Sequence, residues 1–116
     1  MGTLRTPETK ERYDDFIARG GLKNSCILCD KEPLRSFTYW KIVTNDFPFD
    51  RIAKSHDMLV LLHHADSITE AEREELEKLK NGYVNEHYQY IIEITPNTRS
   101  IPGHYHLHLV VAKENE

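Results

Sequence analysis

The sequence lacks any long apolar run. In 116 residues, no stretch approaches the roughly 20 consecutive apolar residues that a membrane-spanning helix requires. The N-terminal segment MGTLRTPETK has no apolar core of the kind found in signal peptides, and the following residues are too acidic for a transit peptide. We therefore expect a cytoplasmic protein with no membrane partner.

Internal repeats, low-complexity tracts and Gly/Ser-rich linkers are also missing. The chain has only 5 glycines and 5 prolines, and its contents of 39% hydrophobic and 29% charged residues are ordinary for a globular chain. This length predicts a single domain over residues 1–116 with one hydrophobic core. The net charge of −4 argues against general binding to nucleic acids.

Cysteine is scarce, and the 2 cysteines lie close together as Cys26 and Cys29 in the stretch CILC. In a reducing compartment this spacing favours metal ligands or a redox pair over a structural disulfide. Two ordinary reduced thiols are an open alternative. A thioredoxin-like role fits poorly, because no predicted strand leads into a helix that starts at the motif.

Two helices are expected. The first covers about residues 6–20, with Thr6 as its N-cap, Pro7 at its first position and Gly20 at its end. The second is SITEAEREELEKLKNGY, in which Thr69 and Glu72 have the spacing of a capping box.

Elsewhere the hydrophobic period is two, which is typical of strands. Four segments show it: SFTYWKIVTN, DMLVLL, HYQYIIEIT and HYHLHLVVA. The order of helices and strands, with short connections between them, predicts an α+β domain built on a mostly antiparallel sheet.

The last of these segments carries three histidines at alternate positions, His104, His106 and His108. In a strand over residues 104–111 they would share one face, and the bulky residues between them would pack beneath a helix on the other. Histidine is neither a strong strand former nor a favoured core residue. The pattern therefore indicates either a metal site or histidines that act as nucleophile and hydrogen-bond partners.

Four segments together resemble the histidine-triad superfamily of nucleotide-binding proteins and hydrolases. HYHLHLVV matches its His-x-His-x-His pattern, and HDMLVLLHH matches a strand with histidines eight residues apart, here His56 and His64. NDFPFD is similar to an Asn-x-x-Pro stretch of the hydrolase and uridylyltransferase branches, and CILC to the Cys-x-x-Cys of zinc-binding members. The segments keep the family order over about three-quarters of the chain.

This resemblance implies a fold of about five mostly antiparallel strands with two helices. It also implies a nucleotide hydrolase or nucleotidyl transferase acting at the α-phosphate of an adenosine or other purine nucleotide. His106 would form a covalent nucleotidyl-histidine intermediate, and His108 would hydrogen-bond the phosphoryl oxygens. The residue type suits this role, because an imidazole with a pKa of about 6.5 is mostly neutral near pH 7.

The resemblance further assigns nucleotide contacts, with Asn45 at the ribose and His56 as a second cleft histidine. The chain departs from the family just before the triad, where TRSIPG replaces Gly-Gln-Ser/Thr-Val. Arg99 or Ser100 is expected to supply a substitute phosphate contact. This departure leaves open a nucleotide-binding module with little or no turnover, stabilised by zinc. A catalytic metal on the three triad histidines is a third hypothesis.

In the zinc-binding branch the resemblance implies a closed structural site, with the Cys-x-x-Cys loop at residues 26–29. The expected ligands are Cys26, Cys29, His64 and His104. His63 competes with His64, and since neighbours on a strand point opposite ways, only one can face the metal. Many members of the family dimerise through the helix that follows the strand between His56 and His64. That helix is short in this chain, and a homodimer is left open.

Overall fold

A five-stranded antiparallel sheet organises the chain in the computed structural model, which describes residues 3–22 and 26–114. The helices are α1 (Pro7–Ala18), α2 (Ile27–Asp30), α3 (Glu70–Asn81) and α4 (Tyr83–His87). The strands are β1 (Arg35–Ser36), β2 (Trp40–Thr44), β3 (Ala53–Leu61), β4 (Tyr90–Ile92) and β5 (His106–Ala112), in the sheet order β1-β2-β3-β5-β4. The predicted α+β class and its antiparallel sheet are confirmed.

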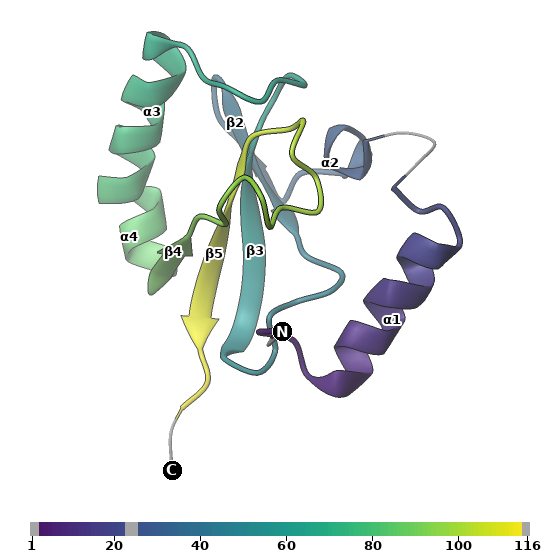
Figure 1. Cartoon of the computed structure of the whole chain (residues 1–116). Helices are drawn as coiled ribbons and strands as arrows, with labels where there is room; N and C mark the ends of the chain where they lie inside the picture. The colour runs from purple at the N-terminus through teal and green to yellow at the C-terminus, as the bar shows by residue number, and fades with distance from the viewer. Residues whose placement is uncertain (1–2, 23–25, 115–116) are drawn as a thin grey trace.

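The main hydrophobic core lies between the sheet and helices α3 and α4, which cover one face of it (Figure 1). Leu107 and Leu109 of β5 point into this core, where they meet Trp40 and Leu59 from the central strands and Leu76 from α3. All five side chains are almost completely buried. The alternation in β5 thus gives its leucines to the core and leaves the opposite face to histidines.

Helix α3 begins and ends where the sequence predicts. Thr69 and Glu72 form a reciprocal capping box at its N-terminus, and Gly82 caps its C-terminus. The chain then continues into the unpredicted helix α4, because Val84 is drawn into the core. The strand expected in HYQYIIEIT is correspondingly reduced to β4. No helix in the described ranges has the length and apolar content to cross a membrane.

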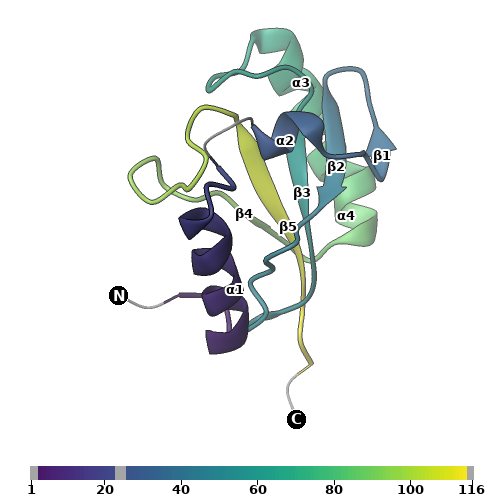
Figure 2. The ribbon, with the colours of Figure 1, turned by 90° about the vertical axis from the view of Figure 1, so that its right-hand side faces the viewer.

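The second face of the sheet carries a smaller apolar cluster beneath α2. Figure 2 shows α2 lying over this face. Leu28 of α2 is completely buried against Val43, Met58 and Val60. The expected Cys-x-x-Cys loop is therefore a helical turn, since burying Leu28 on the sheet stabilises a short helix there. Cys26 occupies its N-cap position.

Helix α1 packs on the connection between β2 and β3. Thr6 caps it and Pro7 occupies its first turn, and Gly20 beyond its end has a φ of 82°, which glycine adopts without strain. The rings of Tyr13 and Phe16 each lie 5.1 Å from that of Phe47 in the connection.

A carboxylate fixes the start of α1 to the same connection. Asp50 accepts hydrogen bonds from the backbone N–H and the hydroxyl of Thr6 and from the hydroxyl of Thr9. Burial acts to raise the pKa of the Asp50 carboxyl, but these hydrogen bonds outweigh it and lower that pKa to about 2. The charged form of Asp50 therefore stabilises the attachment of α1.

We expect the substitution Asp50→Asn to lower the free energy of unfolding by about 1–2 kcal/mol at pH 7, because it weakens charge-assisted hydrogen bonds to Thr6 and Thr9. Urea denaturation measures this. The control is Asp15→Asn, which removes an exposed ion pair with Arg19 and should change stability by less than about 0.5 kcal/mol.

The effect of Asp50 should also depend on pH in a defined direction. The folded-state pKa of Asp50, about 2, lies below the ordinary carboxyl value of 3.8. The contribution of Asp50 to stability is therefore fully present above the ordinary value. It is lost as pH falls toward 2. The stability gap between wild type and Asp50→Asn should thus narrow below about pH 4. A gap that is constant from pH 7 to pH 3 would contradict this role.

Candidate metal centre and histidine pocket

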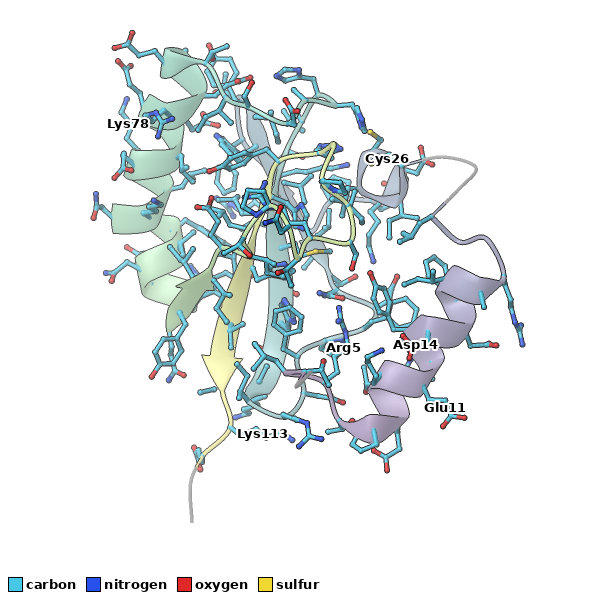
Figure 3. The ribbon with its side chains drawn as sticks, in the orientation of Figure 1. Arg5, Glu11, Asp14, Cys26, Lys78 and Lys113 are labelled. Atoms are coloured by element: carbon cyan, nitrogen blue, oxygen red, sulfur yellow. The ribbon has the colours of Figure 1, made fainter. Side chains whose placement is uncertain are left out.

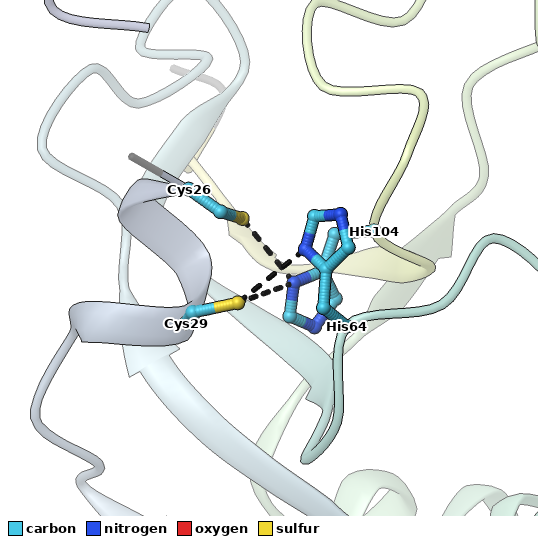
Figure 4. A group of neighbouring side chains, drawn as sticks. All are labelled: Cys26, Cys29, His64 and His104. Atoms are coloured by element: carbon cyan, nitrogen blue, oxygen red, sulfur yellow. Dashed lines mark hydrogen bonds between the residues drawn. The ribbon is translucent and has the colours of Figure 1, made fainter. Parts of the chain in front are cut away.

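Four side chains from three separate segments meet at one end of the sheet (Figure 4). Cys26 and Cys29 come from the N-terminus and body of α2, His64 follows β3, and His104 precedes β5. Their ligand atoms all lie within 4.8 Å of one another. The structure therefore brings together the four residues that the sequence predicts as metal ligands.

The spacing of these atoms fits a bound metal ion. Nδ1 of His104 lies 3.3 Å from Sγ of Cys26 and 3.4 Å from Sγ of Cys29, and Nδ1 of His64 lies 3.4 Å from Sγ of Cys29. In a tetrahedral site with metal–sulfur bonds of about 2.3 Å and metal–nitrogen bonds of about 2.0–2.1 Å, such S···N separations are about 3.5 Å. Two sulfurs and two imidazole nitrogens form a closed set of four ligands.

His104 is oriented by a hydrogen bond on the far side of its ring. Its Nε2–H donates to the carbonyl of Leu61 over 2.7 Å, which leaves the lone pair of Nδ1 directed at the thiols. Only 1% of His104 is exposed. A backbone carbonyl behind a histidine ligand is a common way to fix its tautomer.

This orientation corrects the predicted strand over residues 104–111. Strand β5 begins at His106, because the N–H of Tyr105 donates to the carbonyl of Ala65 while the side chain of His104 turns toward the thiols. The three triad histidines still lie on one side of the sheet, as the sequence predicts, because Tyr105, Leu107 and Leu109 contact the core on the other side while His104 meets the cysteines of α2. His106 and His108 face a pocket, and His104 belongs to the cysteine cluster.

The neighbouring histidines His63 and His64 point to different partners. Nε2 of His63 lies 2.6 Å from a carboxylate oxygen of Glu72 on α3, whereas His64 lies in the cysteine cluster. The structure thus distinguishes the two residues, although both lie in the turn after β3 and not in the strand itself.

A pocket of about 250 Å³ lies over the histidine-bearing face of the sheet. Its walls come from the segment before α1, from α1 and α2, from the β2–β3 connection and from the loop before β5. Among the described residues, three cationic side chains line it, Arg5, Lys31 and Arg99, against one carboxylate, Asp46. In a chain whose net charge is −4, this local excess of positive charge favours an anionic ligand.

His106 presents an unprotonated nitrogen at this pocket. Its Nδ1–H donates to the carbonyl of His104 over 2.7 Å, so in the neutral ring Nε2 keeps its lone pair. Burial lowers the pKa of His106, which favours that neutral form. A neutral imidazole with a free Nε2 has the electronic state of a nucleophile.

His108 presents a proton at the same pocket. The N–H of Phe49 donates to Nδ1 of His56 over 2.9 Å, so Nε2 of His56 carries the proton and donates to Nδ1 of His108 over 2.8 Å. Nε2 of His108 must then be protonated. It is buried and, among the described residues, has no hydrogen-bond partner.

Burial keeps both of these histidines neutral. It is the largest cause that lowers the pKa of His56 to about 4 and that of His108 to about 2, and nearby positive charge adds to it. An unpartnered buried N–H costs free energy, which an acceptor on a bound ligand would offset.

The other predicted nucleotide contacts divide into two groups. Asn45, Arg99 and Ser100 line the pocket together with His108. His56 does not, because it lies behind His108 with 5% of its surface exposed. In this structure His56 contacts His108, and its direct contact with a ligand stays a prediction.

The sequence did not predict that residues before and after the N-cap of α1 line the pocket. Arg5 and Tyr13 line the pocket from this segment, and Lys31 lines it from the end of α2. Nothing in the local pattern of RTPETKERYDDF distinguishes these side chains from ordinary surface residues. Only the docking of α1 on Phe47 places Arg5 and Tyr13 there.

The arrangement does not favour a metal ion held by the triad. Nδ1 of His106 is bonded to a backbone carbonyl, and Nδ1 of His108 to His56. Within the residues that the structure describes, neither belongs to a group of three or more metal-ligating side chains.

Comparisons of the chain with protein-family models, curated protein sequences and solved structures gave no match. What the site can do chemically must therefore be inferred from its own residues.

We expect His64→Ala to weaken metal binding on the order of 100-fold or more, because even partners behind a ligand contribute about 10–100-fold. His63→Ala, next to it in sequence, should leave the metal content unchanged, since His63 contacts Glu72 instead. Elemental analysis of the two purified variants measures this. Loss of metal from the His63 variant alone would contradict the assignment.

Proposed function

We propose that this protein is a nucleotide hydrolase or nucleotidyl transferase of the histidine-triad type, acting at the α-phosphate through a covalent intermediate on His106. One observation carries the proposal: a free Nε2 lone pair on His106 and an unpartnered Nε2–H on His108 occupy the same pocket. Nucleophile and oxyanion donor are the two groups that displacement at phosphorus needs.

In the first step, Nε2 of His106 attacks the α-phosphorus and the bond to the leaving group breaks, so that the leaving group departs with its electron pair. The ring becomes cationic, and the carbonyl of His104, which already accepts from Nδ1–H, stabilises that charge. In the second step, water or another acceptor attacks phosphorus, the bond from phosphorus to Nε2 breaks with its electron pair returning to His106, and the proton of the attacking group is released to solvent. Two moderate barriers replace one high barrier.

His108 would donate its Nε2–H to a non-bridging phosphoryl oxygen, whose negative charge grows as His106 attacks. The row from Phe49 through His56 holds this donor in place before the ligand arrives, which is the arrangement that makes such donors effective. Asn45 would contact the ribose, and Arg99 and Ser100 the phosphate, from other walls of the pocket.

An adenosine or other purine nucleotide is the proposed ligand. Ile27, Leu28, Met58 and Ile101 supply apolar wall for a nucleobase, and the three cations suit a phosphate. The apolar wall fits a planar base but does not distinguish one nucleobase from another. The proposal of a purine therefore rests on the resemblance to the histidine-triad family.

We further propose that the metal is zinc in a structural role. Two thiolates and two imidazoles are a frequent zinc ligand set, and with four protein ligands no open position is left for a substrate. When bound, zinc would join α2 to the end of β3 and to His104. The use of thiolates as ligands fits a reducing, cytoplasmic location.

A nucleotide-binding module with little turnover is the alternative, and the loop before β5 favours it. Arg99 is already engaged there, since its Nε–H donates to the carbonyl of Ile94 and its Nη2 pairs with Glu93. Ser100 is exposed. Turnover of diadenosine polyphosphates, nucleoside phosphoramidates, adenylylated conjugates or sugar nucleotides distinguishes an enzyme from a binding module.

We expect about one zinc per chain in protein purified without chelators. Cys26→Ser and Cys29→Ser should each lower the zinc content and the melting temperature, because the free energy of binding a structural zinc is also folding free energy. Elemental analysis and thermal unfolding measure the two effects. A folded wild type without zinc would contradict the proposal.

His106→Ala, or the milder His106→Asn, should reduce turnover by at least ~10³, on the order of 4 kcal/mol in activation free energy. Zinc content, melting temperature and binding of a nucleoside monophosphate should stay near wild type, because the rest of the pocket is intact. The control is His87→Ala, a histidine exposed on α4 and outside the pocket, which should leave the rate unchanged.

Wild type quenched during turnover of a labelled substrate should carry acid-labile label on His106. If His106→Ala kept most of the wild-type rate, the covalent mechanism would be wrong for this protein. Binding without turnover of any substrate in the screen would favour the binding module.

A further inference from the structure

The segment before α1 contributes a cation to the pocket, at a distance from the histidines. Arg5 lies in the space between α1 and the sheet (Figure 3) and lines the same pocket as His106 and His108. The proposed nucleotide chemistry gives Arg5 no role.

Arg5 is held in a fixed position. Its Nε–H donates to the carbonyl of Phe47 over 2.8 Å, and its Cζ lies 4.2 Å from the ring centre of Tyr13 and 4.9 Å from that of Phe49. A guanidinium oriented by a hydrogen bond and two aromatic rings has lost most of its freedom before any ligand binds.

The charge of Arg5 has no anionic partner in the described part of the chain. No carboxylate forms an ion pair with it there, and its two Nη atoms carry no hydrogen bond. The nearby carboxylates are engaged elsewhere, Asp14 with Lys10 and Asp50 with the start of α1. A half-buried guanidinium without a partner costs desolvation free energy, which an anion on a ligand would offset.

The other two pocket cations differ from Arg5 in this respect. Lys31 pairs with Asp46 at 2.9 Å, and Arg99 pairs with Glu93 at 3.3 Å. Among the cations that the structure describes in the pocket, Arg5 is thus the one without an ion pair, and Asp14 and Asp50 attract it only at longer range.

The distance from Arg5 to the histidines suits a second group on the same ligand. The ring of Phe49 lies 4.8 Å from that of His108 and 4.9 Å from Cζ of Arg5, so at most about 10 Å separates the guanidinium from His108. The charge of Arg5 acts at this range, since it contributes to the lowered pKa of His108.

We infer that Arg5 forms a second anion subsite, which selects ligands carrying a negative group beyond the phosphate at His106 and His108. That a phosphate binds at His106 and His108 rests on the proposed function. That a second anionic group binds at Arg5 rests on the surroundings of Arg5. A nucleoside diphosphate, whose β-phosphate would contact the free Nη donors, should bind more tightly than the monophosphate. The segment before α1 then acts as a specificity determinant.

The test compares the binding of AMP and ADP by calorimetry in wild type and Arg5→Gln. Wild type should bind ADP at least tenfold more tightly than AMP, and Arg5→Gln should remove that preference while AMP affinity stays within about twofold. Arg12→Gln is the matched control, because Arg12 lies over the ring of Phe47 at 5.6 Å but outside the pocket. It should change neither affinity.

An ADP preference that survives in Arg5→Gln would overturn the inference, and so would an equal loss of AMP and ADP affinity. If Arg5→Gln lowers the melting temperature, Arg5→Lys is tested in its place. This variant keeps the positive charge and should keep part of the preference for ADP over AMP. Complete loss of that preference in a folded Arg5→Lys variant would show that Arg5 only shapes the pocket, and would overturn the inference.

If neither nucleotide binds wild type, the proposed function fails, and Arg5 is tested with inorganic ions. Pyrophosphate binding more tightly than phosphate, with the difference lost in Arg5→Gln, would support the subsite. Equal binding of the two ions, or a difference that Arg5→Gln leaves unchanged, would overturn it.

Discussion

His104 connects the two parts of the site through three contacts. Its Nδ1 faces the thiols of Cys26 and Cys29, its Nε2–H donates to Leu61 on β3, and its carbonyl accepts from Nδ1–H of His106. The first two contacts fix the residue, and the third sets which nitrogen of His106 is free. The electronic state of the pocket histidine therefore depends on a residue that itself lies outside the pocket.

The two faces of strand β5 lie in different environments, one in the hydrophobic core and the other at the pocket. Residues of β5 alternate between the core beneath α3 and the face that carries the pocket, so that leucines anchor the strand while histidines present polar atoms. The pairing of Met58 with His108 and of Val60 with His106 adds apolar neighbours on the pocket side. This apolar surrounding explains why burial is the main cause of the low pKa values there.

Local sequence patterns predicted the parts of the fold that depend on interactions between residues close together in the chain. The caps at Thr6 and Thr69 and the alternation of β5 depend on residues only a few positions apart. The turn of His104 out of the strand depends on Ala65 and on the thiols, and the position of Arg5 depends on the docking of α1 on Phe47. Such long-range contacts leave no periodic signal. The Cys-x-x-Cys segment became helical for a related reason, the burial of Leu28.

The row from Phe49 through His56 to His108 has a fixed polarity. A backbone amide can only donate, so each neutral imidazole after it must accept at one nitrogen and donate at the other. The last N–H therefore faces the pocket in every neutral arrangement of the row. The Nε2–H of His108 therefore discriminates ligands by protonation state. It can donate to an oxygen anion, whereas an ammonium group, which can only donate, would face it in an unfavourable contact between two donors.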